Sequence, residues 1–512
     1  MSTHQVLVLL IIQISLILLP APGLYLLFKK AGIKDESWKA FIPFYNTWII
    51  QELAGRPKHW VFWQLVPVMG WFITMGLYVE FVKTFGKFSL WEHALAALLA
   101  PVYFPVLGSD PKTKYLGPAA ARKYKKSTAR EWVDAGIFAI VAATLIRTFV
   151  FEAYVIPSGS MEKTLLVNDY LFVSKFAYGP RIPMTPLSFP FVHNTLPGGE
   201  AKSYLEWIRL PYIRWFASPV KRNDVVVFNL PVGDTVINTT DYGSLVTYYQ
   251  AMRELDYDNL DSARQVILND PDKYPIVLRP VDKEENYIKR CVAIPGDTLQ
   301  IKDQVVYIDG KPQPFPPESE TWYVVKTKGQ PIDEDAFKEE YSVDIAKDDE
   351  FRQTDKPNEY RILLEWQACQ KMLQNHFADS IGPVIDSTYN VYPYSPLCHW
   401  TIDNFGPIVL PKAGLTITLT PENYDLYQRV IRTYEGNDFQ KKNGKYYLNG
   451  QEVTRYTFKG NYFWMMGDNR HDSQDARLWG FVPEDHIVGK ASLIWMSWDK
   501  GIRWSRLFKK IR

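Results

Sequence analysis

The sequence predicts an α-helical transmembrane region followed by a mainly β soluble domain. The first 152 residues contain four apolar runs, each about 20 residues long, which is the length that crosses a ~30 Å hydrocarbon core as a helix. After residue 152, short β-type runs alternate with Gly, Pro and Asn-Gly turns. Aromatic residues make up 15% of the chain, which suits large β surfaces and a membrane interface.

The apolar runs are interpreted as about four transmembrane helices within a membrane region of residues 1–152. A cleaved signal peptide is the alternative for the first run. No Lys or Arg precedes that run, whereas Lys29 and Lys30 follow it directly, which argues against cleavage. The third run is the weakest, since it contains two prolines and begins with a Glu-His pair. The runs span residues 5–28, 60–82, 90–108 and 132–151.

Two basic loops predict the orientation of this region. Residues 29–58 carry six Lys or Arg, and residues 109–131 carry seven. The positive-inside rule places both loops in the cytoplasm, so that the N-terminus and everything after the fourth span lie outside. Ser160 follows Glu152 by only eight positions, so Ser160 is expected close to the outer membrane surface.

Residues 153–512 are expected to form the extracytoplasmic β domain. One helix is predicted over residues 421–434, with Thr420 as N-cap and Pro421 in the first turn. The tail, residues 498–512, places Trp504, Leu507, Phe508 and Ile511 on one helical face among six basic residues, so it is interpreted as either a membrane-binding amphipathic segment or a solvated tail. β-type runs occupy residues 169–176, 224–230, 304–311, 415–420 and 445–453.

Composition limits the possible partners. The 512 residues allow two or more domains, and the formal charge of +2 indicates no nucleic-acid partner. Cys291, Cys369 and Cys398 form no CxxC and no metal-ligand spacing. Buried free thiols are the simpler interpretation, and a Cys369–Cys398 disulfide outside the cytoplasm is the alternative.

Ser160 and Lys163 form a Ser-x-x-Lys sequence, which is typical of penicillin-recognising enzymes. That family also needs a Lys-Thr-Gly strand, and the chain contains none, since residues 326–329 read KTKG. Pro157 and Gly159 further argue against a buried helix that begins at Ser160. This interpretation is therefore disfavoured.

Lys289 is the other candidate base, inside the apolar strand NYIKRCVAI, residues 286–294. It could be an edge-strand lysine that reaches solvent. Alternatively, burial could lower its pKa, and a neutral amine could then take the proton of Ser160. Sequence spacing alone does not choose between these two interpretations.

A resemblance decides between them. The segments PSGSMEKTLL (157–166), KRNDVVVFNLP (221–231), NYIKRCVAIPGDTL (286–299) and MGDNRHDSQDARLWGFVPEDHIVGKA (466–491) resemble, in order, the motifs of bacterial type I signal peptidases. The resemblance implies the β fold of these enzymes and a membrane-bound serine endopeptidase with a serine–lysine dyad. Such an enzyme removes signal peptides from exported preproteins, cuts after small residues of Ala-x-Ala type, and uses no cofactor or metal.

The resemblance also assigns site residues. Ser160 matches the nucleophile and Lys289 the general base, while the Ser158 hydroxyl and the Ser160 N–H match the oxyanion hole. Ser473 matches the serine that orients the lysine amine. Asp475 and Arg477 match a supporting ion pair. Asp468 and Arg470 match further scaffold, although they could equally be surface ion pairs. The substrate pocket is matched by four residues that could also be ordinary core: Tyr154, Ile156, Leu165 and Ile288.

The chain also departs from the family pattern. Glu162-Lys163 stands where many relatives have an apolar residue and proline, and Asn168 stands where glycine is common. His471 is interpreted as a rim residue rather than a triad member. Two insertions, about 232–285 and 312–460, and three additional spans have no assigned role.

The sequence thus predicts a multi-pass protein of the bacterial cytoplasmic membrane whose catalytic domain lies on the periplasmic side. Its expected partners are signal-peptide-bearing preproteins and membrane lipid. A non-catalytic membrane receptor or assembly factor on a peptidase-derived scaffold is the alternative, and the intact set Ser158, Ser160, Lys289 and Ser473 argues against it.

Overall fold

The computed structural model describes residues 3–66, 69–198, 201–239, 241–243, 246–256, 260–346 and 350–511. The chain divides into two compact units. The first comprises Met1–Ile146 with Ile213–Trp215, and the second comprises Arg147–Tyr212 with Phe216–Arg512.

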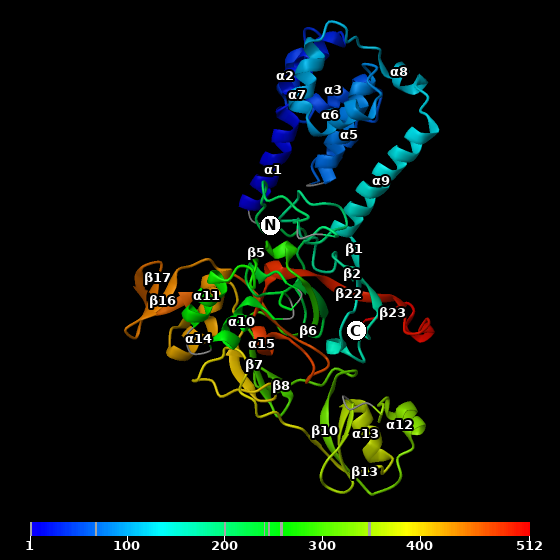
Figure 1. The fold of residues 1–512 in the computed structure, drawn as a ribbon. Helices are drawn as coiled ribbons and strands as arrows, with labels where there is room; N and C mark the ends of the chain where they lie inside the picture. Colours follow the sequence, from blue (N-terminus) through cyan, green and yellow to red (C-terminus); the bar gives the residue numbers. More distant parts are fainter. Residues whose placement is uncertain are drawn as a thin grey trace. The chain divides into compact units, whose positions relative to one another are not determined.

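The first unit is helical (Figure 1). Aromatic side chains of α2, α5 and α7 form its core, where the Phe81 ring lies 6.0 Å from the Phe28 ring and 6.3 Å from the Phe104 ring. Helices α2 and α7 approach so closely that a Cβ at Gly23 would lie 2.4 Å from the Pro105 nitrogen. The helices are α1 (Thr3–Leu18), α2 (Ala21–Lys30), α3 (Tyr45–Ala54), α4 (Trp60–Trp63), α5 (Met69–Lys83), α6 (Leu90–Leu98), α7 (Ala100–Ser109), α8 (Pro118–Lys123) and α9 (Thr128–Phe149).

The helices match the four predicted spans only in part. Two stretches among the described residues, Leu7–Lys30 and Thr128–Phe149, are long and apolar enough to cross a membrane. The third predicted run is bent by 118° between α6 and α7, because Leu99 leaves the helical conformation and α7 begins with a proline in its first turn. The second run holds α4 and α5, and residues 67 and 68 between them lie outside the described residues.

The second unit is built on an eight-stranded antiparallel sheet, as the predicted mainly β class requires. Its strands lie in the order β1-β2-β22-β3-β6-β20-β21, and β23 pairs with β22. Strand β6 therefore lies inside the sheet between β3 and β20. These strands are β1 (Phe151–Val155), β2 (Asp169–Ser174), β3 (Val225–Asn229), β6 (Asn286–Ala293), β20 (Tyr462–Met466), β21 (Val482–Pro483), β22 (Ile487–Ser497) and β23 (Lys509–Lys510).

Large aromatic side chains fill the core beside this sheet. Trp464 of β20 is fully buried, and its ring lies 5.2 Å from Phe405 and 5.5 Å from Phe481. Burial of such large apolar side chains is the main favourable contribution to folding. The core anchors the end of β20, from which the segment of residues 467–475 continues.

In the described part of the first insertion, the strands β4 and β5 pair, and two α-helices follow β4, α10 (Tyr248–Leu255) and α11 (Leu260–Asn269). The second contains a four-stranded sheet, β10–β13, with α12 (Glu334–Tyr341) and α13 (Trp366–Gln374) beside it, drawn in yellow-green in Figure 1. Val325, Ile362 and Met372 are completely buried in a core of its own. The strands are β4 (Thr235–Ile237), β5 (Ile276–Leu278), β10 (Glu320–Thr327), β11 (Phe351–Gln353), β12 (Glu359–Glu365) and β13 (Ala378–Pro383).

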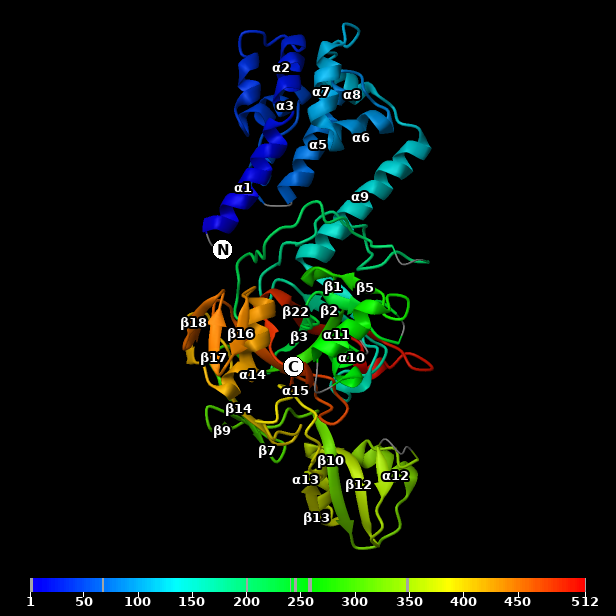
Figure 2. The same cartoon turned by 60° about the vertical axis from the view of Figure 1, so that its left-hand side comes forward.

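Smaller sheets and two helices complete the unit, and Figure 2 shows β16–β18 beside α14. They are β7 (Thr298–Lys302), β8 (Val305–Ile308), β9 (Lys311–Pro312), β14 (Phe405–Val409), β15 (Thr416–Thr418), β16 (Phe439–Lys442), β17 (Lys445–Leu448), β18 (Gln451–Val453), β19 (Arg455–Thr457), α14 (Pro421–Arg429) and α15 (Ala476–Trp479).

The local sequence predictions are mostly confirmed. All five predicted β runs contain strands, and 445–453 forms the hairpin β17–β18. The predicted helix over 421–434 is also confirmed as α14 followed by a π-helical turn, and the Thr420 side chain accepts a hydrogen bond from the Asn423 N–H. The three cysteines are free thiols, so the structure has no Cys369–Cys398 disulfide.

The prediction of one helical face in the tail is wrong. The Arg506 guanidinium donates to both carboxylate oxygens of Asp169 and to the Thr164 carbonyl. Strand β23 then pairs with β22. This buried ion pair and the pairing of β23 hold the tail in an irregular path. The helical prediction was based only on the spacing of the apolar residues, which contains neither contact. Trp504 and Phe508 nevertheless remain exposed.

Candidate active site

Ser160 lies on a short 3₁₀ turn, Gly159–Met161, shortly after β1. Pro157 cannot donate a ladder hydrogen bond, so the strand ends before it. Met161 is completely buried and anchors the turn, and the Leu165 N–H donates to the Met161 carbonyl over 2.7 Å. The Ser160 carbonyl accepts a hydrogen bond from the Asn469 N–H at 3.2 Å. The turn is thereby held both to the core and to the segment after β20.

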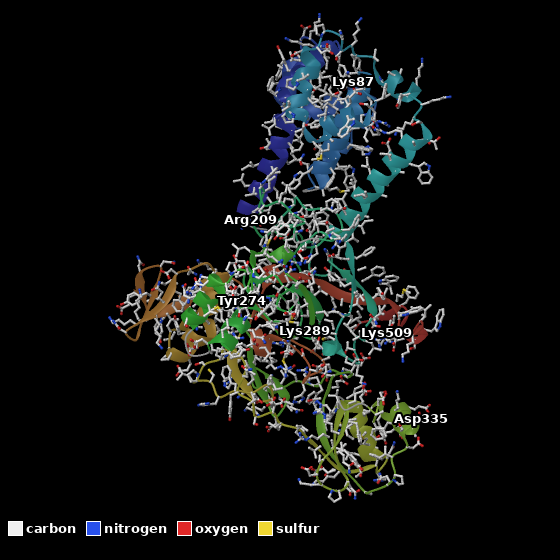
Figure 3. The ribbon with its side chains drawn as sticks, viewed as in Figure 1. Lys87, Arg209, Tyr274, Lys289, Asp335 and Lys509 are labelled. Atoms are coloured by element: carbon white, nitrogen blue, oxygen red, sulfur yellow. The ribbon has the colours of Figure 1, made fainter. Side chains whose placement is uncertain are left out.

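Lys289 meets this turn from the middle of the sheet. Lys289 of β6 pairs with Val226 of β3 in the sheet, and Figure 3 labels the Lys289 side chain. The Nζ atom donates a hydrogen bond to Ser160 Oγ at 2.5 Å across 129 positions of sequence. Only 3% of Lys289 is exposed. The alternative of an edge-strand lysine that reaches solvent is therefore wrong.

The surroundings of Lys289 make its ammonium form a stronger acid than that of an exposed lysine. Burial lowers the pKa of Lys289 to about 8, because removal from water disfavours the ammonium form. The carboxylates of Asp475 and Asp468 oppose this effect, and Arg477 adds to it. The neutral amine that a proton acceptor requires is therefore available just above neutral pH.

Lys163 takes no part in this arrangement. The turn that holds Ser160 has only three residues, so no helix brings Lys163 back to the serine. Its Nζ donates instead to the Ser342 carbonyl at 2.8 Å. Lys163 also adopts a positive φ of 68°, which directs the chain out of the helical conformation.

Asp475 and Arg477 form a completely buried ion pair. Arg477 Nη2 donates to Asp475 Oδ2 at 2.8 Å, and the Gly467 N–H donates to the same carboxylate at 3.0 Å. Burial opposes ionisation of Asp475, but Arg477 and the hydrogen bonds outweigh it and lower the pKa of this carboxyl. The pair connects residue 467 to α15.

Asp468 is buried too, but its cationic partner is Arg290 and not Arg470. Arg290 Nε and Nη2 donate to the two carboxylate oxygens at 2.8 and 2.6 Å, and Thr164 Oγ1 donates at 2.6 Å. Arg470 is itself buried, and burial lowers its pKa to about 10. The alternative of surface ion pairs is therefore wrong for Asp468 and Arg470. Sequence reasoning missed Arg290 and Thr164, although the position of Arg290 directly after Lys289 on a buried strand was a signal.

Ser473 lies against the turn that carries Ser160. A Cβ at Gly467 would be 2.1 Å from Ser473 Oγ and 2.5 Å from the Ser160 carbonyl, so only glycine permits this approach. The Ser473 hydroxyl is buried and has no hydrogen-bond partner among the described residues. The predicted hydrogen bond from Lys289 to Ser473 is thus absent in this arrangement, in which the amine donates to Ser160 Oγ. Ser158, just before the turn, is exposed with an extended backbone.

The four predicted pocket residues lie in two adjoining apolar clusters. Ile156 and Leu165 are buried with Met161 and Leu171 in one cluster, which Ile288 contacts. Ile288 and Tyr154 also pack on the second cluster, Val173, Val227 and Val488. These residues share an apolar wall adjacent to the Ser160 turn.

His471 has the aspartate partner that the sequence did not reveal. Its Nε2 lies 3.0 Å from Asp403 Oδ2, and its Nδ1 lies 2.8 Å from Thr321 Oγ1. These contacts tie the segment after β20 to the second insertion. Among the described residues, no group of three or more His, Cys, Asp or Glu is arranged to hold a metal ion.

Two parts of the chain match known protein families. Residues 129–377 and 413–498 match the family described as signal peptidase, peptidase S26. Residues 38–118 match a family of unknown function.

Individual relatives are similar over most of their length. The chain is 26% identical to signal peptidase I of Haemophilus influenzae over 75% of this chain and 77% of the relative. It is 26% identical to signal peptidase I of Buchnera aphidicola, over 72% and 77% of the two chains. It is 23% identical to that of Rickettsia massiliae, over 76% and 88%. With its family match over more than half of the sequence, the chain belongs to the signal peptidase family, peptidase S26, and is a serine endopeptidase.

Proposed function

We propose that this membrane-anchored peptidase removes signal peptides from exported preproteins with a Ser160–Lys289 dyad. The observation that carries the proposal is the 2.5 Å hydrogen bond to Ser160 Oγ from the Nζ atom of Lys289, a residue that is only 3% exposed. The relatives named signal peptidase I support the substrate class.

Lys289 acts as the general base in this mechanism. Its neutral amine takes the hydroxyl proton as Ser160 Oγ attacks the carbonyl carbon at the cut. The protonated amine then returns the proton to the leaving amino group, and an acyl-enzyme remains on Ser160. A water molecule, activated by the same amine, hydrolyses the ester and releases the signal peptide.

The oxyanion that forms during attack needs hydrogen-bond donors. The Ser160 N–H and the Ser158 hydroxyl are proposed for this role, because the first belongs to the turn that carries the nucleophile and the second directly precedes that turn. Donors aimed at the developing charge typically contribute ~10²–10³ in rate. Their attachment to the buried Met161 keeps the turn in one conformation.

The residues after β20 position the base. Asp475, held by Arg477 and the Gly467 N–H, keeps the adjacent loop in place. Ser473 is proposed to orient the Lys289 amine, since its buried hydroxyl has no other hydrogen-bond partner among the described residues and could accept from the amine once Ser160 is acylated.

Cleavage after small residues is proposed from the apolar wall beside Ser160. Ile156 and Leu165 are almost completely buried, so the wall cannot yield much space to a larger side chain. A methyl group at the −1 and −3 positions of the substrate would fit against it, and a ring or branched chain would overlap.

The active site is proposed to lie on the periplasmic side of the cytoplasmic membrane in a multi-pass chain. Two basic segments, residues 29–58 and 109–131, precede α9, and the positive-inside rule would hold both in the cytoplasm. None of the residues of α9 is buried against the rest of the chain, which suits a helix surrounded by lipid.

The dyad predicts a clear difference between two lysines. On a preprotein with neutral residues after the cut, Lys289→Ala and Ser160→Ala should each lower kcat/KM by at least the order of 10³-fold, since a catalytic group is lost. Lys163→Ala should keep most of the activity, because its amine donates to Ser342. Cleavage in detergent, followed by gel shift, measures all three variants. A folded Lys163→Ala protein without activity would refute the dyad.

The lowered pKa of Lys289 predicts the pH profile. The active species is the neutral amine, so kcat/KM should rise about tenfold per pH unit below the pKa and level off above it. With the pKa of Lys289 at about 8, the plateau begins in the alkaline range. A profile that is flat from about pH 5 to pH 10 would exclude a lysine base with this pKa.

The apolar wall predicts substrate selection at −1. A preprotein with Ala at −1 should be cleaved, and the same preprotein with Phe or Leu should not. Ile156→Ala removes part of the wall and should relax this selectivity more than it lowers cleavage of the Ala substrate. Initial rates on matched substrates give the ratio, and equal cleavage of Ala and Phe substrates by the wild type would contradict the proposal.

The proposed orientation predicts which tags a protease can reach. Tags at residue 45 and residue 120 should be protected in intact spheroplasts, since both positions lie in basic segments. A tag at the C-terminus should be digested in the same preparation. Digestion of the tag at 120 in sealed spheroplasts would overturn the multi-pass arrangement.

A further inference from the structure

A polar cleft adjoins the turn that carries Ser160. Gly159, Glu162 and Lys163 line it from the turn side, and Glu320 and Trp322 line it from β10 of the second insertion. Figure 1 shows β10 at the start of that inserted sheet. The cavity has a volume of about 550 Å³, within the ~300–1,000 Å³ typical of ligand sites.

The chemistry of the cleft differs from that of the apolar wall. Four carboxylates face three basic side chains and one histidine along its lining. Ile156, Leu165 and Ile288 are not part of it. An apolar signal peptide with small residues at the cut is not matched by such a lining, whereas a polar segment of the exported protein is.

Glu320 is the unusual group in the cleft. It is 1% exposed, and neither carboxyl oxygen has a hydrogen-bond partner among the described residues. Lys163 Nζ lies 3.9 Å from Glu320 Oε2 but donates its hydrogen bond to the Ser342 carbonyl. A buried carboxyl without a hydrogen bond is costly, since it has lost its water without replacement. Burial accordingly raises the pKa of Glu320 to about 8, an effect that an arriving cation would reverse.

The backbone holds Glu320 in register with the nucleophile. The Glu320 N–H donates to the Asp468 carbonyl, and the Glu320 carbonyl accepts from the Arg470 N–H, both at 2.9 Å. The residue between them, Asn469, donates its N–H to the Ser160 carbonyl at 3.2 Å. A single hydrogen-bonded segment thus connects the backbone of Glu320 to the turn that carries Ser160, and Glu320 and Gly159 line the same cavity.

We propose that this cleft binds the segment of the preprotein that follows the scissile bond, and that Glu320 recognises a lysine or arginine side chain in that segment. The inference rests on the proposed peptidase function and adds a specificity determinant to it. A cationic side chain would supply the missing partner of the carboxylate through charge-assisted hydrogen bonds, bidentate in the case of arginine. The Trp322 ring, with the Arg352 guanidinium 5.1 Å from its centroid, forms part of the same wall.

Two preproteins that differ only after the cut test the proposal. One carries lysine and arginine at the second to fourth positions of the released protein, and the other carries glutamate and aspartate there. Wild-type enzyme should cleave the basic substrate with a KM about tenfold lower, the effect of one charge-assisted hydrogen bond. Glu320→Gln keeps the shape of the side chain but removes its charge, and should bring the KM ratio close to one.

A matched control lies on the same insertion outside the cleft. Glu339 of α12 is exposed and does not line the cavity, so Glu339→Gln should retain the full preference. Equal KM values in the wild type, or an unchanged ratio in Glu320→Gln, would overturn the proposal. So would an equal loss on both substrates with a lowered melting temperature, because Glu320 would then only stabilise the loop. The two proposals fail separately: the peptidase function is tested by the requirement for Ser160, and the cleft by the loss of the KM preference in Glu320→Gln.

Discussion

A lysine amine held away from water, with its hydrogen bond directed at Ser160, is the constraint on which this catalytic unit depends. Lysine is normally charged at neutral pH, and only burial makes its neutral form accessible. The interior position of β6 supplies that burial, and it lowers the pKa of Lys289 to about 8. Two neighbouring carboxylates, Asp475 and Asp468, act against it. Because these carboxylates lie close to the amine, their tendency to raise the pKa of Lys289 has to be limited.

Two arginines meet this requirement. Arg477 pairs with Asp475 and Arg290 pairs with Asp468, each through two hydrogen bonds to the carboxylate. Removal of one partner from either pair would be strongly destabilising, since the other charge would remain buried without compensation. They also fix the loop after β20, where Gly467 lets Ser473 approach the Ser160 turn. The ion pairs thus affect both the charge around Lys289 and the position of the Ser160 turn.

The second insertion extends the molecule without altering the central sheet. Within it, strands β10–β13 form a separate sheet with a separate core, so the size of this part is not limited by the strand order around β6. Its connection to the site is the backbone of Glu320, which pairs with the loop of residues 468–470. His471 strengthens that connection through Thr321 and Asp403. The insertion can therefore form one wall of a cleft beside Ser160 while the sheet that carries Lys289 is unchanged.

The sequence alone determined the fold class, the short strands, the Thr420 cap and the four motifs that identify the family, because these depend on local periodicity, turn residues and residue identity. It indicated Ser160 and Lys289 by resemblance, but the spacing of 129 residues could not bring them together. Only the tertiary structure decided that Lys289 is buried, that Asp468 pairs with Arg290, that the third apolar run bends by 118° and that the tail is not one helix. It alone placed Glu320 beside Ser160. Each of these depends on contacts between segments distant in sequence, whose burial and charge environment no local pattern contains.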